Sequence, residues 1–132
     1  MTQKKKTFDS IKINYVYEDL LKQLKKNLNL IHNKNYNKRY WEILLSRWLF
    51  TFVVDIYTIW QIAEKIKPSN FSKFISLKLD KKIFVTENTL HYHISNSTSL
   101  DKLWAHYTFI RIIKFIHKNK IKNEEYELRR NF

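Results

Sequence analysis

The chain contains no glycine in 132 residues and only one proline. Glycine makes up about 7% of an average protein, and it supplies the left-handed backbone that tight turns and phosphate-binding loops need. This sequence therefore has no glycine-built turn, no glycine-rich phosphate loop and no dinucleotide-binding fingerprint. Either the chain does not bind a nucleotide, or the part of the protein that binds it lies elsewhere.

The composition indicates a folded, cysteine-free and strongly basic chain. Hydrophobic residues are 44% and aromatic residues 16%, enough to bury a core. The absence of cysteine excludes a disulfide framework, a thiolate metal site and a cysteine nucleophile. The net charge of +13 suggests an anionic partner. However, there are 20 lysines against 5 arginines, and Lys, Asn, Ile, Tyr and Phe make up 65 of the 132 residues. AT-rich codons encode these five residue types, so codon bias explains much of the charge.

Apolar residues with helical spacing predict three substantial helices. The first covers about residues 18–32, the second residues 38–67, and the third residues 100–118. The second helix ends before Pro68, and its apolar face is so wide that we expect burial on several sides. The predicted fold is therefore mainly α, with the first and last helices packed on the long central helix and at most a small β-hairpin.

The remaining segments complete the predicted organisation. Residues 1–16 are expected to form a polar tail and a short extended segment, residues 17–118 the helical domain, and residues 119–132 a charged tail. Alternating apolar residues between 75 and 85 suggest the hairpin, and residues 86–94 a short capped helix.

The central helix also resembles a membrane span, because Arg47 and Asp55 are the only charged residues from Ile43 to Ala63. A central aspartate costs about 3 kcal/mol on insertion scales, so a buried core helix is the preferred interpretation. Residues 1–6 are charged and no apolar run follows them. This start does not resemble a signal peptide, and we expect a cytoplasmic location.

The most distinctive pattern lies between residues 32 and 57. A histidine precedes an Arg-Tyr-Trp triplet, a Trp-Leu pair begins seven residues after the first tryptophan, and further aromatic residues follow: His32, Arg39, Tyr40, Trp41, Trp48, Leu49, Phe52 and Tyr57. This order resembles the amino-terminal region of a family of transferases encoded among bacterial surface-polysaccharide biosynthesis genes. The chain departs from that pattern at Ser46-Arg47, where the family has Gly-Pro, and at Thr58-Ile59-Trp60, where the family has an Asp-Arg pair.

The resemblance implies a glycosyltransferase-like enzyme several times longer than this chain. The chain would then be an amino-terminal fragment, inactive by itself, whose partner is the remainder of the transferase or a second copy of itself. A nucleotide sugar would bind only in the full-length enzyme, to a portion beyond Phe132. We predict no cofactor for these residues, and whether the chain itself is an enzyme stays open.

Individual side chains do not form a recognisable catalytic or metal site. Trp41 and Trp48 share one helix face and are expected in the core, whereas Arg39 points away as a solvated charge or as a clamp for phosphate or carboxylate. His91 and His93 lack a third metal ligand nearby, and His106 and His117 are three helical turns apart. No metal site is predicted, and the catalytic residues remain unassigned.

Two other functions stay open at this stage. A small basic nucleic-acid-binding module would use lysines and stacked aromatic rings, but the aromatic residues fall on apolar helix faces and no binding motif is recognisable. A peripheral membrane protein would use its basic surface and an aromatic helix to contact anionic lipid.

Asp55 and Arg111 are the candidate buried charges. Asp55 shares a face with the apolar residues of the central helix, and Arg111 lies on the apolar side of the last helix. A buried charge needs a partner, so we predict that these two form an ion pair. Tyr107, a tryptophan ring N–H, or a group in another part of the enzyme are the alternative partners of Asp55.

A double-mutant cycle tests this ion pair. The Asp55→Ala variant is expected to lower the free energy of unfolding by roughly 3 kcal/mol, because it leaves a buried cation without its partner. The double variant Asp55→Leu/Arg111→Met should lose much less. Urea unfolding measures all variants, and an equal loss for Asp55→Ala with and without Arg111 would show that the two residues are not paired.

Overall fold

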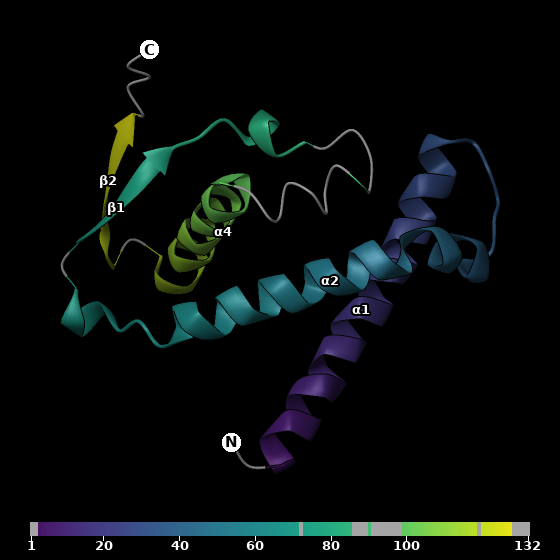
Figure 1. The fold of residues 1–132 in the computed structure, drawn as a ribbon, viewed down its shortest axis with the longest axis horizontal. Coiled ribbons are helices and arrows are strands. Elements are labelled where there is room, and N and C mark those ends of the chain that lie inside the picture. Colours follow the sequence, from purple (N-terminus) through teal and green to yellow (C-terminus); the bar gives the residue numbers. More distant parts are fainter. Residues whose placement is uncertain (1–2, 72, 86–89, 91–98, 119, 128–132) are drawn as a thin grey trace. The chain divides into compact units, whose positions relative to one another are not determined.

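The computed structural model describes residues 3–71, 73–85, 90, 99–118 and 120–127 (Figure 1). It confirms the predicted mainly α fold with three substantial helices. The chain divides into two compact units, Met1–Tyr57 and Thr58–Phe132. The elements in chain order are α1 (Gln3–Ile31), α2 (Lys38–Glu64), a 3-10 helix (Pro68–Asn70), β1 (Lys73–Lys78), a second 3-10 helix (Lys81–Phe84), α4 (Ser99–His117) and β2 (Lys122–Glu127).

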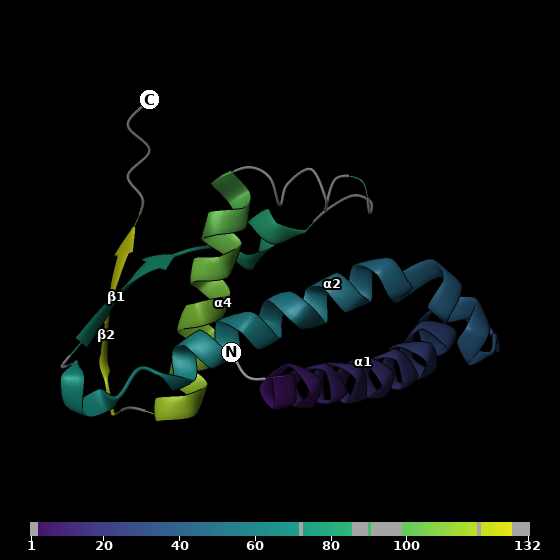
Figure 2. The ribbon, with the colours of Figure 1, turned by 60° about the horizontal axis from the view of Figure 1, so that its bottom comes forward.

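The first unit is a pair of helices, α1 and the first part of α2, which lie side by side (Figure 2). Their core consists of Tyr17 and Leu21 from α1 and Leu49 and Val53 from α2. Leu21 and Leu49 are almost completely inaccessible to solvent. Burial also raises the pKa of Tyr17 above its usual value, because the phenolate form loses hydration.

The first helix begins much earlier than its sequence predicts. Residues 3–16 continue α1, so the expected tail and extended segment over residues 1–16 were wrong. The apparent alternation of Ile11, Ile13 and Tyr15 had suggested a strand. In the helix only Ile13 packs against the core, four residues before Tyr17, while Ile11 and Tyr15 are 64% and 75% exposed. Spacing of four residues, not two, decides which side chain is buried.

A left-handed residue ends α1 without the help of glycine. Asn33 has φ of 51°, and the backbone N–H of Lys34 donates to the carbonyl of Asn29 at 2.8 Å. The N–H of Asn33 itself donates to the carbonyl of Leu30 at 3.3 Å. This is the Schellman arrangement, in which asparagine replaces the usual glycine. Lys118 takes a similar position, with φ of 36°, directly after α4.

The second unit contains the last turns of α2, together with α4 and a two-stranded sheet. Ala63 of α2 packs with Ile112 and Ile113 of α4, and all three are buried. Partly buried apolar residues surround them: Ile59, Trp60, Ile66, Phe74, Phe109 and Ile116. The helix prediction for residues 38–67 was close, since α2 ends at Glu64 and the 3-10 helix starts at Pro68.

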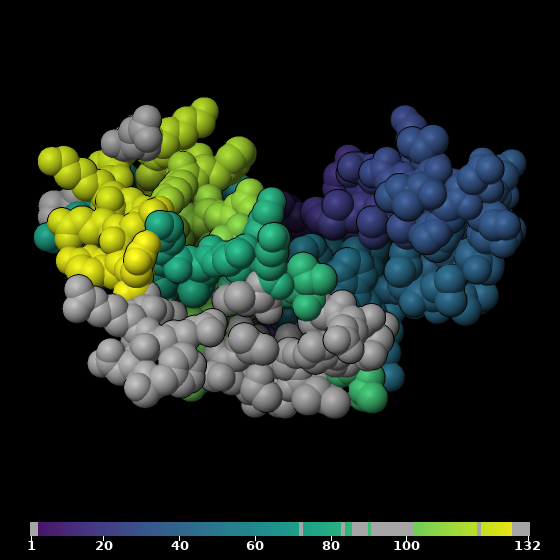
Figure 3. Space-filling model, turned by 90° about the horizontal axis from the view of Figure 1, so that it is seen from above, coloured from purple at the N-terminus to yellow at the C-terminus, as the bar shows by residue number. Residues whose placement is uncertain are grey.

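The sheet is parallel and joins segments that are far apart in sequence. β1 pairs with β2 from Lys73 opposite Lys122 to Lys78 opposite Glu127, as Figure 1 shows. In the space-filling view of Figure 3, the yellow surface near the carboxyl end adjoins teal surface from the part of the chain that contains β1. The predicted hairpin was therefore wrong, because residues 81–84 form a 3-10 helix. The prediction of a charged tail over residues 119–132 missed β2. The predicted short helix over residues 86–94 lies almost entirely outside the described residues.

Opposite charges explain why such a polar segment can form a strand. β2 has the sequence Lys-Asn-Glu-Glu-Tyr-Glu, and its glutamates meet lysines of β1. Lys73 pairs with Glu124 at 3.0 Å, and Lys78 pairs with Glu127 at 2.9 Å. Cross-strand pairs of opposite charge stabilise a sheet modestly. The hydrogen bond between Lys78 and Glu127 lowers the pKa of the glutamate and raises that of the lysine.

The Lys78–Glu127 pair predicts how the sheet responds to pH. Because the pKa of Glu127 is lowered, its contribution to stability is present above the ordinary carboxyl pKa of 4.5 and is lost as the pH falls through the lowered value. The contribution of Lys78 is present below 10.5 and is lost as the pH rises through its raised value. NMR titration should therefore show Glu127 titrating below its usual range. Lys78→Met should return that pKa to normal, whereas Lys120→Met should leave it unchanged.

Candidate functional site

The family-like residues at the start of the distinctive pattern meet where α1 connects to α2. Asn29, in the last turns of α1, organises this connection through its side-chain amide. Its Oδ1 accepts hydrogen bonds from the Trp41 ring Nε1 at 2.9 Å and from the Tyr36 backbone N–H at 3.1 Å. Its Nδ2 donates to the Tyr36 carbonyl at 2.9 Å. One amide therefore binds the connecting segment and the first turn of α2 to α1.

Three aromatic rings, those of His32, Tyr36 and Tyr40, lie around the Trp41 indole that binds this amide. Tyr40 stacks near Tyr36, with ring centroids 4.1 Å apart, and contacts Trp41 edge-on at 5.1 Å. The ring of His32 lies 6.1 Å from that of Trp41. Trp41 is only 7% exposed, whereas Tyr36 and Tyr40 are 38% and 41% exposed. A buried indole thus supports a partly exposed surface of His32, Tyr36 and Tyr40, which we call the aromatic surface.

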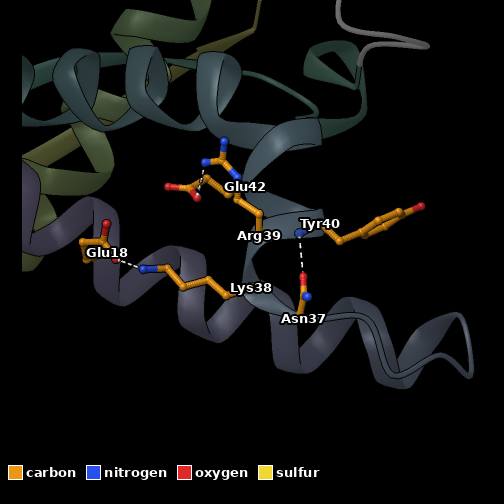
Figure 4. A network of polar contacts seen from close by, with 6 residues as sticks. All are labelled: Glu18, Asn37, Lys38, Arg39, Tyr40 and Glu42. Atoms are coloured by element: carbon orange, nitrogen blue, oxygen red, sulfur yellow. Dashed lines mark hydrogen bonds and ion pairs between the residues drawn. The ribbon is translucent and has the colours of Figure 1, made fainter.

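The start of α2 carries charges next to the aromatic surface. Asn37 caps the helix, because its Oδ1 accepts from the backbone N–H of Tyr40 at 2.9 Å. In Figure 4 the side chain of Lys38 extends to Glu18 on α1. The Tyr40 ring points away from this ion pair and from a second one between Arg39 and Glu42. The hydrogen bond to Glu18 raises the pKa of Lys38.

Arg39 forms an exposed ion pair. Its Nη1 lies 3.1 Å from a carboxylate oxygen of Glu42, and its side chain is 74% exposed. An ion pair this exposed contributes little to stability. The guanidinium remains accessible to solvent, as expected for a residue facing away from Trp41.

The later residues of the pattern lie elsewhere in the first unit. Trp48 is partly buried against the core and stacks with Phe52 at 5.4 Å. The Tyr57 hydroxyl donates to Asp9 on α1 at 2.7 Å, and Lys12 lies over the same ring at 5.8 Å. These residues join α1 to α2. The pattern therefore separates into an exposed part, His32 to Tyr40, and a packing part, Trp41 to Tyr57.

The two candidate buried charges have different surroundings. Asp55 is partly buried on α2. Arg111 is exposed on α4, where its Nη1 donates to the Tyr107 hydroxyl at 3.1 Å and the guanidinium lies 5.6 Å from that ring. The expectation of a buried arginine was therefore wrong. An exposed cation left without its partner costs little, so the roughly 3 kcal/mol loss expected for Asp55→Ala does not follow from Arg111. The ion pair between Asp55 and Arg111 stays a prediction, since the two residues belong to different units.

The histidines do not gather into a metal site. Among the described residues, no group of three or more His, Cys, Asp or Glu could hold a metal ion. His106 Nε2 accepts a hydrogen bond from the Leu77 backbone N–H at 3.1 Å and so joins α4 to β1. His91 and His93 lie outside the described residues.

The arrangement of side chains at the α1–α2 connection suits ligand binding better than catalysis. Exposed tyrosine and histidine rings can stack on a planar or apolar partner, and Arg39 beside them can bind an acidic group. Sequence reasoning missed Asn29 and Asn37. The position of Asn37 before the first helical residue is a recognisable capping signal, but nothing in the sequence marks Asn29 among twelve asparagines.

Helix α2 also resembles a membrane-spanning helix. By length and composition alone it could span a membrane, with a mean hydropathy of 1.4 in its most apolar 18-residue window. Only 11% of that window is buried, so the expectation that α2 is buried on several sides was wrong for the part of the chain that the structure describes. One helix of this kind is weak evidence for a membrane protein, because helices of soluble proteins pass the same test.

Replacing Asn29 tests whether its amide organises the connection. Asn29→Leu leaves the Trp41 indole N–H and the Tyr36 N–H without their acceptor, so it should lower the free energy of unfolding by about 2 kcal/mol. Urea unfolding measures the loss, and the Trp41 indole resonance should exchange faster with solvent. Asn27→Leu on the exposed surface of the same helix is the control. Equal effects of the two substitutions would contradict the role of Asn29.

The comparisons with known proteins agree with the motif. A profile described as LIC12162 family transferase matches residues 1–131, which include every residue of the distinctive pattern. No curated protein and no solved structure matches the chain. Since the matched range covers almost the whole sequence, the chain belongs to the LIC12162 family of transferases.

Proposed function

We propose that this chain is the amino-terminal, helical part of a glycosyltransferase-like enzyme of bacterial surface-polysaccharide biosynthesis, acting in the cytoplasm. The family match over residues 1–131 is the observation that carries the proposal. The helices would support the enzyme and bind its other parts, and a nucleotide sugar would bind outside these residues. The chain by itself would be inactive.

The composition supports a nucleotide-sugar site outside these residues. Glycosyl transfer from a nucleotide sugar needs groups that bind a diphosphate, and glycine-rich turns commonly bring backbone N–H groups close to phosphates. The chain has no glycine. The aromatic surface at the start of α2 has stacking rings and one accessible guanidinium, but no side chain there has a recognisable role in breaking the bond between a sugar and its phosphate.

An exposed apolar stripe on α1 supports docking against the rest of the enzyme. Phe8, Ile11 and Tyr15 are three and four residues apart, so they lie on one face of the helix. They are 64%, 64% and 75% exposed. Large exposed apolar side chains that line up on one face commonly mark a binding surface.

A membrane surface is the second candidate partner for the same stripe. Lys4, Lys5, Lys6 and Lys12 are exposed on the same helix, and apolar residues flanked by lysines can bind anionic lipid. Sedimentation with anionic vesicles at low salt distinguishes the two candidates. Binding that the apolar stripe requires would favour the membrane, and its absence would leave docking within the enzyme.

Genetic complementation tests the proposed function. Deleting the gene is expected to shorten or abolish the surface polysaccharide, visible as a changed ladder after gel electrophoresis. The triple variant Phe8→Gln/Ile11→Gln/Tyr15→Gln should fail to restore the ladder, because it removes the apolar docking surface and leaves the core of the first unit intact. An unchanged ladder after deletion would contradict the surface-polysaccharide role.

Two controls make this experiment specific. The variant Ser10→Gln/Asn14→Gln changes exposed polar residues of the same helix and should restore the ladder fully. Circular dichroism should show equal helix content for both variants.

Calorimetry with a nucleotide sugar should detect no binding to the 132-residue chain. Micromolar binding would contradict the proposal that the nucleotide sugar binds outside these residues.

A further inference from the structure

A cavity of about 360 Å³ lies in the second unit, between the end of α4 and the start of β2. Its volume falls at the lower end of the range for small-molecule sites. Its lining is partly apolar, from Phe74, Ile113 and Ile121, and partly basic or polar, from Lys114, His117, Lys118, Lys122 and Asn123.

Two lysines at this cavity form no ion pair with the residues that the structure describes. Lys114, which also lines the cavity, pairs with Glu125 at 3.3 Å. Lys118 and Lys122 are exposed, and no ion pair involves either of them within the described ranges. No acidic residue lines the cavity among the residues that the structure describes. Two positive charges at one cavity therefore remain uncompensated.

Stabilisation of the α4 dipole explains only part of this arrangement. The carboxyl end of a helix carries about half a negative charge, which favours cations in the last turn. Lys118 directly follows α4 and can serve this role. Lys122 is in β2, and the dipole effect falls off within the last turn. Two full positive charges also exceed the half charge of the helix end, so the cavity favours an anion.

The imidazole of His117 adds an unused polar group. His117 lines the cavity, and its Nε2 is buried without a hydrogen-bond partner in the described part of the chain. Buried polar atoms in folded proteins nearly always have a partner. The described residues do not supply a partner for this nitrogen, and a polar ligand bound beside the ring would.

We propose that this cavity binds a phosphate monoester with a small apolar substituent. A monoester carries close to two negative charges near neutral pH, which matches Lys118 and Lys122. Its substituent would lie against Phe74, Ile113 and Ile121. The phosphates of a nucleotide sugar are esterified at both ends, so this ligand is chemically distinct from the donor. The inference does not depend on the proposed transferase function.

Calorimetry with phenyl phosphate tests the cavity, using the 132-residue chain at constant ionic strength and a pH of about 8, where the monoester is a dianion. Phenyl phosphate should bind about tenfold more tightly than phenyl sulfate, which has one charge, because each lysine makes a charge-assisted hydrogen bond. It should also bind more tightly than inorganic phosphate, which lacks the apolar group. Equal affinity for all three anions would overturn the proposal.

Matched lysine variants locate the binding. The variant Lys118→Gln/Lys122→Gln should weaken phenyl phosphate binding by about tenfold or more. Lys67→Gln/Lys120→Gln is the control, because it removes the same charge from two exposed lysines that do not line the cavity. It should leave the affinity unchanged. Equal weakening by both variants would show attraction to the overall positive charge and would overturn the site. Neither binding experiment affects the complementation result, so the cavity proposal and the proposed transferase function can be contradicted independently.

Discussion

Each core of this protein is built on the apolar surface of α2. Leu49 and Val53 pack with α1 in the first unit, and Ala63 packs with α4 in the second. The helix can serve both units because its apolar residues extend around a wide face over 27 residues. α1 packs on this helix, whereas α4 packs on both α2 and β1. The hydrophobic effect at α2 is therefore the interaction on which the other contacts depend.

The same apolar excess leaves surface that the described residues do not cover. Ile43 and Leu44 of α2 are 67% and 57% exposed, and the stripe on α1 is exposed as well. Apolar side chains in such positions gain free energy when a partner removes them from water. A helical part of a larger transferase would use this gain for assembly, which is why we favour a docking role over a catalytic one.

The connection between α1 and α2 shows how polar groups complete what apolar packing begins. Trp41 is buried, and burying its ring N–H requires an acceptor, which Asn29 provides at 2.9 Å. The same oxygen accepts from Tyr36 and so positions the connecting segment. The family-like residues near this point are close together because one amide and one indole fix the turn. Arg39 and Tyr40 then extend from a rigid helix start rather than from a loose loop.

Helical periodicity in the sequence determined most of the helical fold. The boundaries of α2 and α4 lie close to the predicted ones. For α2, the stop at Pro68 is a signal of local chemistry. The motif from His32 to Tyr57 likewise identified the transferase family without any structure. Local signals of this kind act over a few residues, so a single sequence contains them in full.

Tertiary structure decided the elements that depend on distant partners. A parallel strand needs a crossover connection, and Lys73 meets Lys122 only after α4 has intervened, so no local turn signal could reveal β1 and β2 as a pair. The high charge of residues 119–132 predicts a tail, but Lys73 and Lys78 of β1 pair with Glu124 and Glu127 and so stabilise β2. The hydrogen bond between Asn29 and Trp41 and the cavity at Lys118 and Lys122 also depend on contacts between segments that are apart in the sequence. The sequence by itself determined where α2 and α4 lie, and the folded chain decided which polar groups are in contact, because those contacts depend on distance in space rather than along the chain.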